Sequence, residues 1–346
     1  MNKQKITICI LAALALLIIL AGCGRDSVKT STSSSRLHMD TVVRITASAR
    51  SESEAERAIE AGFTKIKSIE KLMDRHNPSS ALSKINSNSG SWVQSDRDII
   101  EAIETSKQFS RQTGGAFDIS IAPVIDLWAG AAEKGQKPSP EKLSMAKSLV
   151  DYRKIKTDRR KGRVKLAESG MKLDLGAIAK GYALDRAKEA MKKAGAAGGL
   201  INAGGDILCF GKNASAGGWK IGVRSPEANG QNDIECILEI NSGAIATSGD
   251  YLRFYEIEGI KTSHIINAST GKGSLLFKSA TVFADNAADA DALATSLSLL
   301  GRDQGLKLIE SIEGAECFAI ASKGEERIKS SGWDKLILQR YSQEEH

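Results

Sequence analysis

The sequence predicts an α+β fold in which mixed or antiparallel sheets are flanked by helices. Apolar residues recur at helical spacing early in the chain, over residues 52–73, and again late, over residues 286–301. Between these regions, residues 201–271 divide into short segments separated by turn residues, which is typical of strands in a sheet. Helices grouped on both sides of a run of strands indicate α+β architecture rather than a regular alternation of strand and helix.

Local patterns predict the individual elements in order. Residues 40–48 alternate between two faces like a strand, and the helix over residues 52–73 ends at a loop marked by Pro78. The remaining elements that we expect are a helix over 97–113, a glycine-rich loop over 113–123, a short helix from Ser139, strands at 163–167 and 171–175, a helix from Gly176 to Lys193, helices at 286–301 and 303–312, and a strand at 316–322. No GxGxxG fingerprint is present, so a dinucleotide-binding Rossmann domain is excluded.

The amino terminus predicts a bacterial lipoprotein. Lys3 and Lys5 precede an apolar run, residues 6–20, that is too short for a comfortable membrane span and ends in small residues before Cys23. We expect a signal peptide over residues 1–22, cleavage before Cys23, and a lipid on its thiol that holds the protein at the extracytoplasmic face of a membrane. The alternative is an uncleaved anchor helix, which also places the folded part outside the cytoplasm.

Composition limits the organisation and the partners of the mature chain. Residues 23–36 are rich in Ser and Thr and predict a flexible tether, and residues 37–342 are long enough for one large domain or two interleaved lobes. Removal of the signal peptide lowers the net charge from +6 to +4, and no basic clusters alternate with aromatics, which argues against nucleic acid. Cys209, Cys236 and Cys317 show no C-x-x-C spacing, so neither a zinc site nor a disulfide framework is indicated, and a single disulfide stays open.

A carboxylate stands at the junction of a predicted strand and helix in residues 172–185. Gly176 ends the alternation of the strand, so Asp174 can accept from free N–H groups at the helix start or from a polar ligand. The carbonyl of Ala177 would lie in the same corner. A plain helix cap and a ligand site are equally good readings of this segment alone.

The helix at residues 288–301 brings a carboxylate and a hydroxyl together. Asp291 and Thr295 are four residues apart and share a face, and hard oxygens with few carboxylates suit Mg²⁺, which takes its other ligands from water and substrate phosphates. Asp285 and Asp289 lie in the same first turns. The alternative, which this segment alone favours, is a helix start enriched in acids by its dipole.

Three further segments carry groups that suit a ligand site. In residues 113–123, Gly114 and Gly115 allow close backbone approach, Phe117 offers a ring for stacking and Asp118 an acceptor, although a plain turn is the alternative. Residues 201–207 form a tight turn whose amides could approach a phosphate. His264 ends a strand, and a lone histidine is more often structural than catalytic.

Taken together, these segments resemble the flavin transferases of the ApbE type, the FAD:protein FMN transferases. The resemblance covers nearly the whole folded part, in order: HMDT at 38–41, DRHNPSSALSKIN at 74–86, TGGAFDIS at 113–120, KLDLGAIAKGYALD at 172–185, INAGGDI at 201–207, GVRSP at 222–226, ATSGDY at 246–251, SHIINASTG at 263–271 and ADALAT at 290–295. It implies a two-lobed α+β fold that binds FAD and Mg²⁺ in the groove between the lobes.

The resemblance also implies site residues. FAD would be lined by Met39, His76, Ala116, Phe117, Asp118, Asp174, Lys180, His264 and Ile265, and the metal would be held by the carbonyl of Ala177, Asp291 and Thr295. Two departures from the family pattern matter. Position 76 is often Tyr, so stacking there would be by imidazole, and some members carry an acid at the position of Ala294 and a hydroxyl at that of Ala177, so the metal would keep more water here.

The reaction that the resemblance implies moves FMN from FAD to a threonine hydroxyl of an acceptor protein and releases AMP, with Asp291 and His264 as the catalytic residues. His264 is the candidate base because its ordinary pKa lies near neutrality. The acceptors would be membrane-bound redox subunits beside the lipid anchor. Two alternatives stay open: a Mg²⁺-dependent FAD pyrophosphatase that yields FMN and AMP, and a lipoprotein that only binds flavin, which Asp291 and Thr295 disfavour.

Overall fold

The structure, a computed structural model, describes residues 28, 30–213, 217–226, 234–249, 254–257, 260–323 and 326–340. The expected signal peptide, Cys23 and the first part of the expected tether lie outside these residues. None of the helices in the described ranges is long and apolar enough to cross a membrane.

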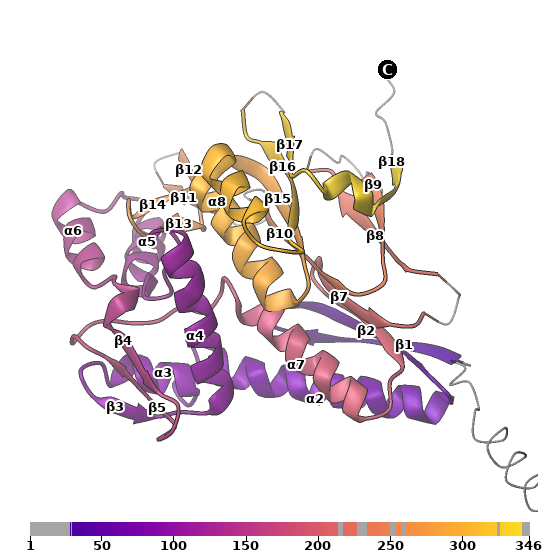
Figure 1. Ribbon diagram of the computed structural model, residues 1–346. Coiled ribbons are helices and arrows are strands. Elements are labelled where there is room, and N and C mark those ends of the chain that lie inside the picture. The colour runs from indigo at the N-terminus through magenta and orange to yellow at the C-terminus, as the bar shows by residue number, and fades with distance from the viewer. Residues whose placement is uncertain are drawn as a thin grey trace, which may run out of the picture.

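An eight-stranded sheet, antiparallel at every step, forms the centre of the molecule (Figure 1). Its strand order is β1-β2-β6-β7-β10-β15-β16-β17. The strands are β1 (Thr30–His38), β2 (Thr41–Ala49), β6 (Gly198–Ala203), β7 (Asp206–Gly211), β10 (Gly243–Gly249), β15 (Phe277–Ala284), β16 (Glu316–Ala321) and β17 (Arg327–Lys329).

Three helices cover one face of this sheet and pack against one another. They are α2 (Glu52–Met73), α7 (Ala179–Lys193) and α8 (Ala287–Glu310), and α7 lies between the other two (Figure 1). The period-two pattern of β10 explains the two layers: Ala244 and Ala246 face the core beneath the helices, while Ile245 faces a second core on the opposite side. A three-stranded sheet in the order β18-β9-β8 closes that second core. Its strands are β8 (Trp219–Arg224), β9 (Ile234–Ile240) and β18 (Ile337–Arg340), and a short 3₁₀ turn, η2 (Trp333–Leu336), precedes β18.

A second lobe is inserted between α2 and α7 and joined by the hairpins that follow β10. Its helices are α3 (Ala81–Ser87), α4 (Arg97–Gln112), α5 (Ala122–Lys134) and α6 (Pro140–Ser148), with a 3₁₀ turn η1 (Tyr152–Lys154). Its strands are β3 (Trp92–Gln94), β4 (Ile155–Asp158) and β5 (Arg163–Leu166) in one sheet, and the paired β11 (Phe254–Ile257) with β12 (Ile260–Ser263) and β13 (Ile266–Asn267) with β14 (Lys272–Gly273). Trp128 of α5 and Ile266 of β13 share one small core, which ties the late hairpins to the inserted lobe. The α+β architecture with two interleaved lobes is confirmed.

Several sequence expectations about elements differ from the structure. The flexible tether expected as far as Arg36 is already a strand from Thr30, because its polar residues pair along β2 at the edge of the sheet, where one side needs no apolar cover. The strand expected at 171–175 is only a single parallel bridge between Ile121 and Lys172, and α7 begins at Ala179 rather than Gly176. The break expected near residue 302 is a kink within α8 at Gly301, whose φ is 76°.

Candidate active site

Two tight turns lie side by side at one end of the large sheet. Met39 and Asp40 join β1 to β2 with φ of 52° and 59°, and Gly204 and Gly205 join β6 to β7 with φ of 64° and 105°. The turns adjoin because β2 pairs with β6, and a Cβ at Gly204 would come 2.4 Å from Oγ1 of Thr41. The sequence therefore places glycine where a side chain would push the two turns apart.

Asp206 follows the second turn and anchors a partly buried ion pair. The side chain of Asp206 is 4% exposed. One of its oxygens accepts the backbone N–H of Thr247 in β10 at 3.3 Å, and the other is paired with the ammonium group of Lys180 in α7. The predicted site residue Lys180 thus points to the sheet end. Asp206 was expected only as part of a tight turn, and its partner could not be read from the sequence because the pair joins residues on different elements.

Asp291 is a second buried carboxylate beside this pair. It is 6% exposed, and its Oδ2 accepts the backbone N–H of Gly181 at 3.0 Å. The pKa of Asp291 is raised to about 7, mainly by burial and also by the charge of Asp206, while Lys180 and the N–H of Gly181 oppose the shift. Asp206 pairs with the ammonium of Lys180, and Asp291 lies close enough to this pair for both charges to affect its pKa.

The other two residues expected at a metal are Thr295 and Ala177. Thr295 lies one turn further along α8, half-buried, with Oγ1 3.4 Å from Oγ of Ser248 in β10. Ala177 lies in the turn before α7, four residues ahead of Gly181, and packs partly buried against the main core. Within the described ranges, no three His, Cys, Asp or Glu residues are grouped so that they could hold a metal. A cation at Asp291 would therefore also draw on hydroxyl, carbonyl or substrate oxygens.

Asp174 fixes the turn that precedes α7. Its Oδ1 accepts the N–H of Gly176 at 2.7 Å, and its Oδ2 accepts from Nη1 of Arg75 at 2.8 Å. The N–H of Asp174 donates to the carbonyl of Ile119 at 2.7 Å, which joins this turn to the glycine-rich loop at 113–120. The capping interpretation holds in modified form, since Asp174 caps the turn and not α7 itself. His76 is exposed in the same loop as Arg75, and Asp74 accepts its N–H at 2.8 Å.

The loop at 113–120 is held by its own buried groups. Asp118 is 7% exposed and accepts from the N–H and hydroxyl of Ser120, at 2.8 and 2.7 Å, and from the N–H of Tyr152 at 2.8 Å. Phe117 is 2% exposed and packs against Phe109, with ring centroids 6.1 Å apart. The expectation that Phe117 offers its ring for stacking is wrong, because the ring is a core side chain, and any ligand here would meet the loop backbone instead.

The segment that carries His264 adjoins this loop. The N–H of Ala268 donates to the carbonyl of Ala116 at 3.1 Å, so residues 264–268 and the glycine-rich loop are directly joined. Ile265 is 8% exposed, and its N–H donates to Oγ of Ser263 at 3.1 Å while its carbonyl accepts from Ser274 at 2.8 Å. His264 itself is half-buried. The structure therefore gathers the predicted residues into two groups, one along the α7–α8 contact and one along the joined loops.

Known proteins match this chain over most of its length. A family model described as the ApbE family matches residues 39–319. A Treponema pallidum protein named FAD:protein FMN transferase is 30% identical over 326 residues, which cover 88% of this chain and 89% of that protein, and a Haemophilus influenzae protein of the same name is 28% identical over 86% and 88%. A crystal structure of the ApbE protein from Thermotoga maritima has a TM-score of 0.81 and 29% identity, covering 89% of this chain and 99% of that one.

Proposed function

This chain belongs to the ApbE family, and we propose that it transfers FMN from FAD to a threonine hydroxyl of an acceptor protein in a Mg²⁺-dependent reaction that releases AMP. It is an enzyme that moves FMN from FAD to protein, the activity for which its relatives are named. The observation that carries the finer proposal is the buried carboxylate of Asp291 beside the ion pair of Asp206 with Lys180.

The residues at this position fit a hard divalent cation. A carboxylate as buried as Asp291 is costly to keep charged unless a cation lies beside it. Asp291, the hydroxyl of Thr295 and the carbonyl of Ala177 would hold Mg²⁺, which prefers such oxygens and completes its shell from water and phosphate. When bound, Mg²⁺ would neutralise charge that develops on the pyrophosphate oxygens.

The transfer exchanges one phosphorus–oxygen bond for another. The threonine oxygen forms a bond to the phosphorus of the FMN phosphate, the bond from that phosphorus to the AMP phosphate breaks, and AMP leaves with the electron pair. We assign the threonine proton to the imidazole of His264, which returns it to water after the transfer. The joined loops around Ala116 and Ile265 would orient the flavin part, and Lys180 would face the phosphates.

We also propose that the enzyme is anchored by lipid at Cys23 on the extracytoplasmic face of a bacterial membrane. The apolar run and small residues before Cys23 support this, and a short tether before β1 would hold the active site near membrane-bound redox subunits. Such subunits, with a threonine flavinylation site, are the acceptors that we propose.

One incubation series tests the proposed function. Purified protein is mixed with FAD, with and without Mg²⁺, and with and without an acceptor subunit that carries the threonine, while AMP release and covalent flavin fluorescence are followed. We expect AMP and protein-bound flavin to appear together, only with Mg²⁺ and acceptor, and to be lost when the acceptor threonine is changed to valine. Free FMN and AMP without acceptor would instead identify a pyrophosphatase, and flavin binding without AMP a passive binder.

A further inference from the structure

Helices α7 and α8 exchange carboxylates at their amino-terminal turns. The N–H of Gly181 in α7 donates to Asp291 of α8 at 3.0 Å, and the N–H groups of Ala287 and Ala288 in α8 donate to Asp185 of α7 at 3.0 and 2.9 Å. The spacing is the same in both helices. Asp185 lies four residues after Gly181 in α7, and Asp291 lies four residues after Ala287 in α8. Each helix thus satisfies donors at the other's start, which no intrahelical carbonyl can reach.

The helices can exchange these groups because they approach very closely. A Cβ at Gly181 would lie 2.0 Å from the carbonyl oxygen of Ala287, so the crossing point has room for glycine alone. Asp185 is 7% exposed and Asp291 is 6% exposed on either side of this crossing. A small shift of α8 along α7 would therefore break both sets of hydrogen bonds together.

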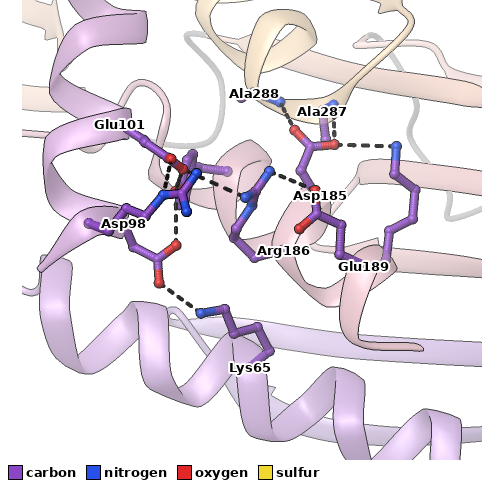
Figure 2. Close-up of polar contacts among 11 residues, drawn as sticks. Lys65, Asp98, Glu101, Asp185, Arg186, Glu189, Ala287 and Ala288 are labelled. Atoms are coloured by element: carbon purple, nitrogen blue, oxygen red, sulfur yellow. Dashed lines mark hydrogen bonds and ion pairs between the residues drawn. The ribbon is translucent and has the colours of Figure 1, made fainter. Parts of the chain in front are cut away.

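The position of Asp185 is itself fixed by the opposite side of α7. Figure 2 shows Asp185 reaching toward Ala287 and Ala288, while Arg186, next in sequence, points toward Glu101 of α4, with Nη1 3.7 Å from that carboxylate. The neighbouring Asp98 of α4 is bound by Lys65 of α2 at 2.7 Å. The hydroxyl of Tyr182 in α7 also donates to Asp98 at 2.9 Å, so contacts with α4 hold α7 and make Asp185 a rigid acceptor for the start of α8.

We propose that Asp185 is a positioning residue of the active site, which fixes the start of α8 on α7 and so sets how tightly Asp291 binds a divalent cation. Asp185 contacts the helix that carries the metal ligand and acts through it, as partners of metal ligands commonly do. The inference rests on the Mg²⁺ site of the proposed function. It explains why a buried carboxylate that is not itself an assigned ligand lies at the end of the 172–185 segment.

Asp185→Asn tests this, because asparagine keeps the size of the side chain but offers one acceptor oxygen to two N–H groups. The probe is Mn²⁺, whose free-ion EPR signal reports binding without turnover, titrated with FAD present at constant concentration. Glu189→Gln is the matched control, since Glu189 lies one turn later on α7 and pairs with Arg186 at the surface. We expect Mn²⁺ affinity to fall about 10- to 100-fold in Asp185→Asn, with the KM for FAD unchanged and the transfer rate recovering at high Mg²⁺, and no change in Glu189→Gln.

Each alternative result has one meaning. If Asp185→Asn melts at a lower temperature but binds Mn²⁺ within twofold of wild type, Asp185 has a structural role only and the inference is overturned. If wild type itself binds no Mn²⁺, the metal site of the proposed function is wrong, and the inference with it.

A second variant covers the case in which Asp185→Asn does not fold. Ala287→Pro removes one of the two donors at the first position of α8, where proline is tolerated, and Asn286 already has the extended backbone (φ −137°, ψ 158°) that a residue before proline adopts. The same fall in Mn²⁺ affinity is expected, and unchanged affinity would overturn the inference.

Discussion

Glu70 of α2 accepts the backbone N–H of Met39 at 2.5 Å, and its other oxygen lies 2.9 Å from Nδ1 of His38. Met39 and the following Asp40 both have left-handed backbone, which non-glycine residues adopt only at a cost. The carboxylate therefore holds a strained turn at the edge of the active site, and such strain persists only where the surroundings impose it.

Glu70→Ala should loosen this turn. The N–H of Met39 would lose its acceptor, which we expect to lower the free energy of unfolding by about 1 kcal/mol and to weaken FAD binding, as measured by urea unfolding and by flavin fluorescence. Asp40→Gly is the opposing control, because glycine suits the second position of this turn and should raise stability. Loss of stability in both variants would show that the left-handed backbone is not under strain.

Asp291→Asn should abolish most of the transfer activity while leaving the fold intact. The amide keeps an oxygen for the N–H of Gly181 but removes the one charged group assigned to the metal, so we expect the rate to fall by several orders of magnitude at ordinary Mg²⁺ concentrations. Ser298→Ala is the control on the same helix, since the hydroxyl of Ser298 donates within α8, to the carbonyl of Ala294 at 3.0 Å. Normal turnover by Asp291→Asn would show that Asp291 is not a metal ligand, and Asp285 and Asp289 would be the next residues to test.

The sequence could predict Asp291 and Thr295 together because their partnership is local, four residues apart on one helix. It could not predict Asp185 or Glu70, because each acts across a contact between elements that are far apart in the chain. The glycine within the α7 pattern, Gly181, was the one signal of close approach, although it does not say what approaches.

Composition and alternation were misleading where backbone partners decide the structure. The serines and threonines after residue 29 suggested a tether, yet their backbone pairs with β2 over its whole length. The alternation around Asp174 suggested a strand, but that segment is tied by an N–H to the carbonyl of Ile119 and by a side-chain turn, with no neighbouring strand beyond one bridge. The expectation that Phe117 meets a ligand failed because the ring is buried in the core. Burial depends on tertiary packing, which the sequence of the loop does not reveal.

Asp118 should make stability depend on pH. Burial raises the pKa of Asp118, and the bonds from Ser120 and Tyr152 offset this only in part. Because the native state then holds the proton more strongly than the unfolded chain, the stabilisation is present below about pH 4 and is lost as pH rises through the native pKa. Asp118→Asn lacks this titration. Its amide NH2 group would face the N–H of Tyr152, which lowers the stability of the variant equally at every pH. The stability advantage of wild type over the variant, from urea unfolding, should therefore shrink from pH 4 to pH 8, and a constant difference would contradict the assignment.

Cys23→Ser should separate the enzyme from the membrane without altering its chemistry. A serine cannot carry the thioether-linked lipid, so we expect labelled fatty acid to be absent and the protein to be unprocessed or released. All described elements lie beyond this position, from β1 onward, so transfer to a soluble acceptor should proceed at the wild-type rate. Normal lipid labelling of the variant would remove the lipoprotein proposal.

His264 is the residue for which catalytic and structural roles predict opposite results. As the base it should tolerate His264→Ala with nearly normal folding and FAD affinity, yet the transfer rate should fall about 10²- to 10⁴-fold, the usual range for one acid–base group. The wild-type rate should also rise with pH through an apparent pKa that the variant lacks. If half-buried His264 has only a packing role, His264→Ala should instead lower the stability or weaken FAD binding, with a normal rate at saturating FAD.

Single-turnover rates and FAD affinities of this variant across pH distinguish the two roles, because a near-normal rate with an unaltered pH profile would require a different proton acceptor. The carboxylates near the acceptor hydroxyl would then be the groups to test, starting with Asp174, which already lies at the junction of the loop and α7.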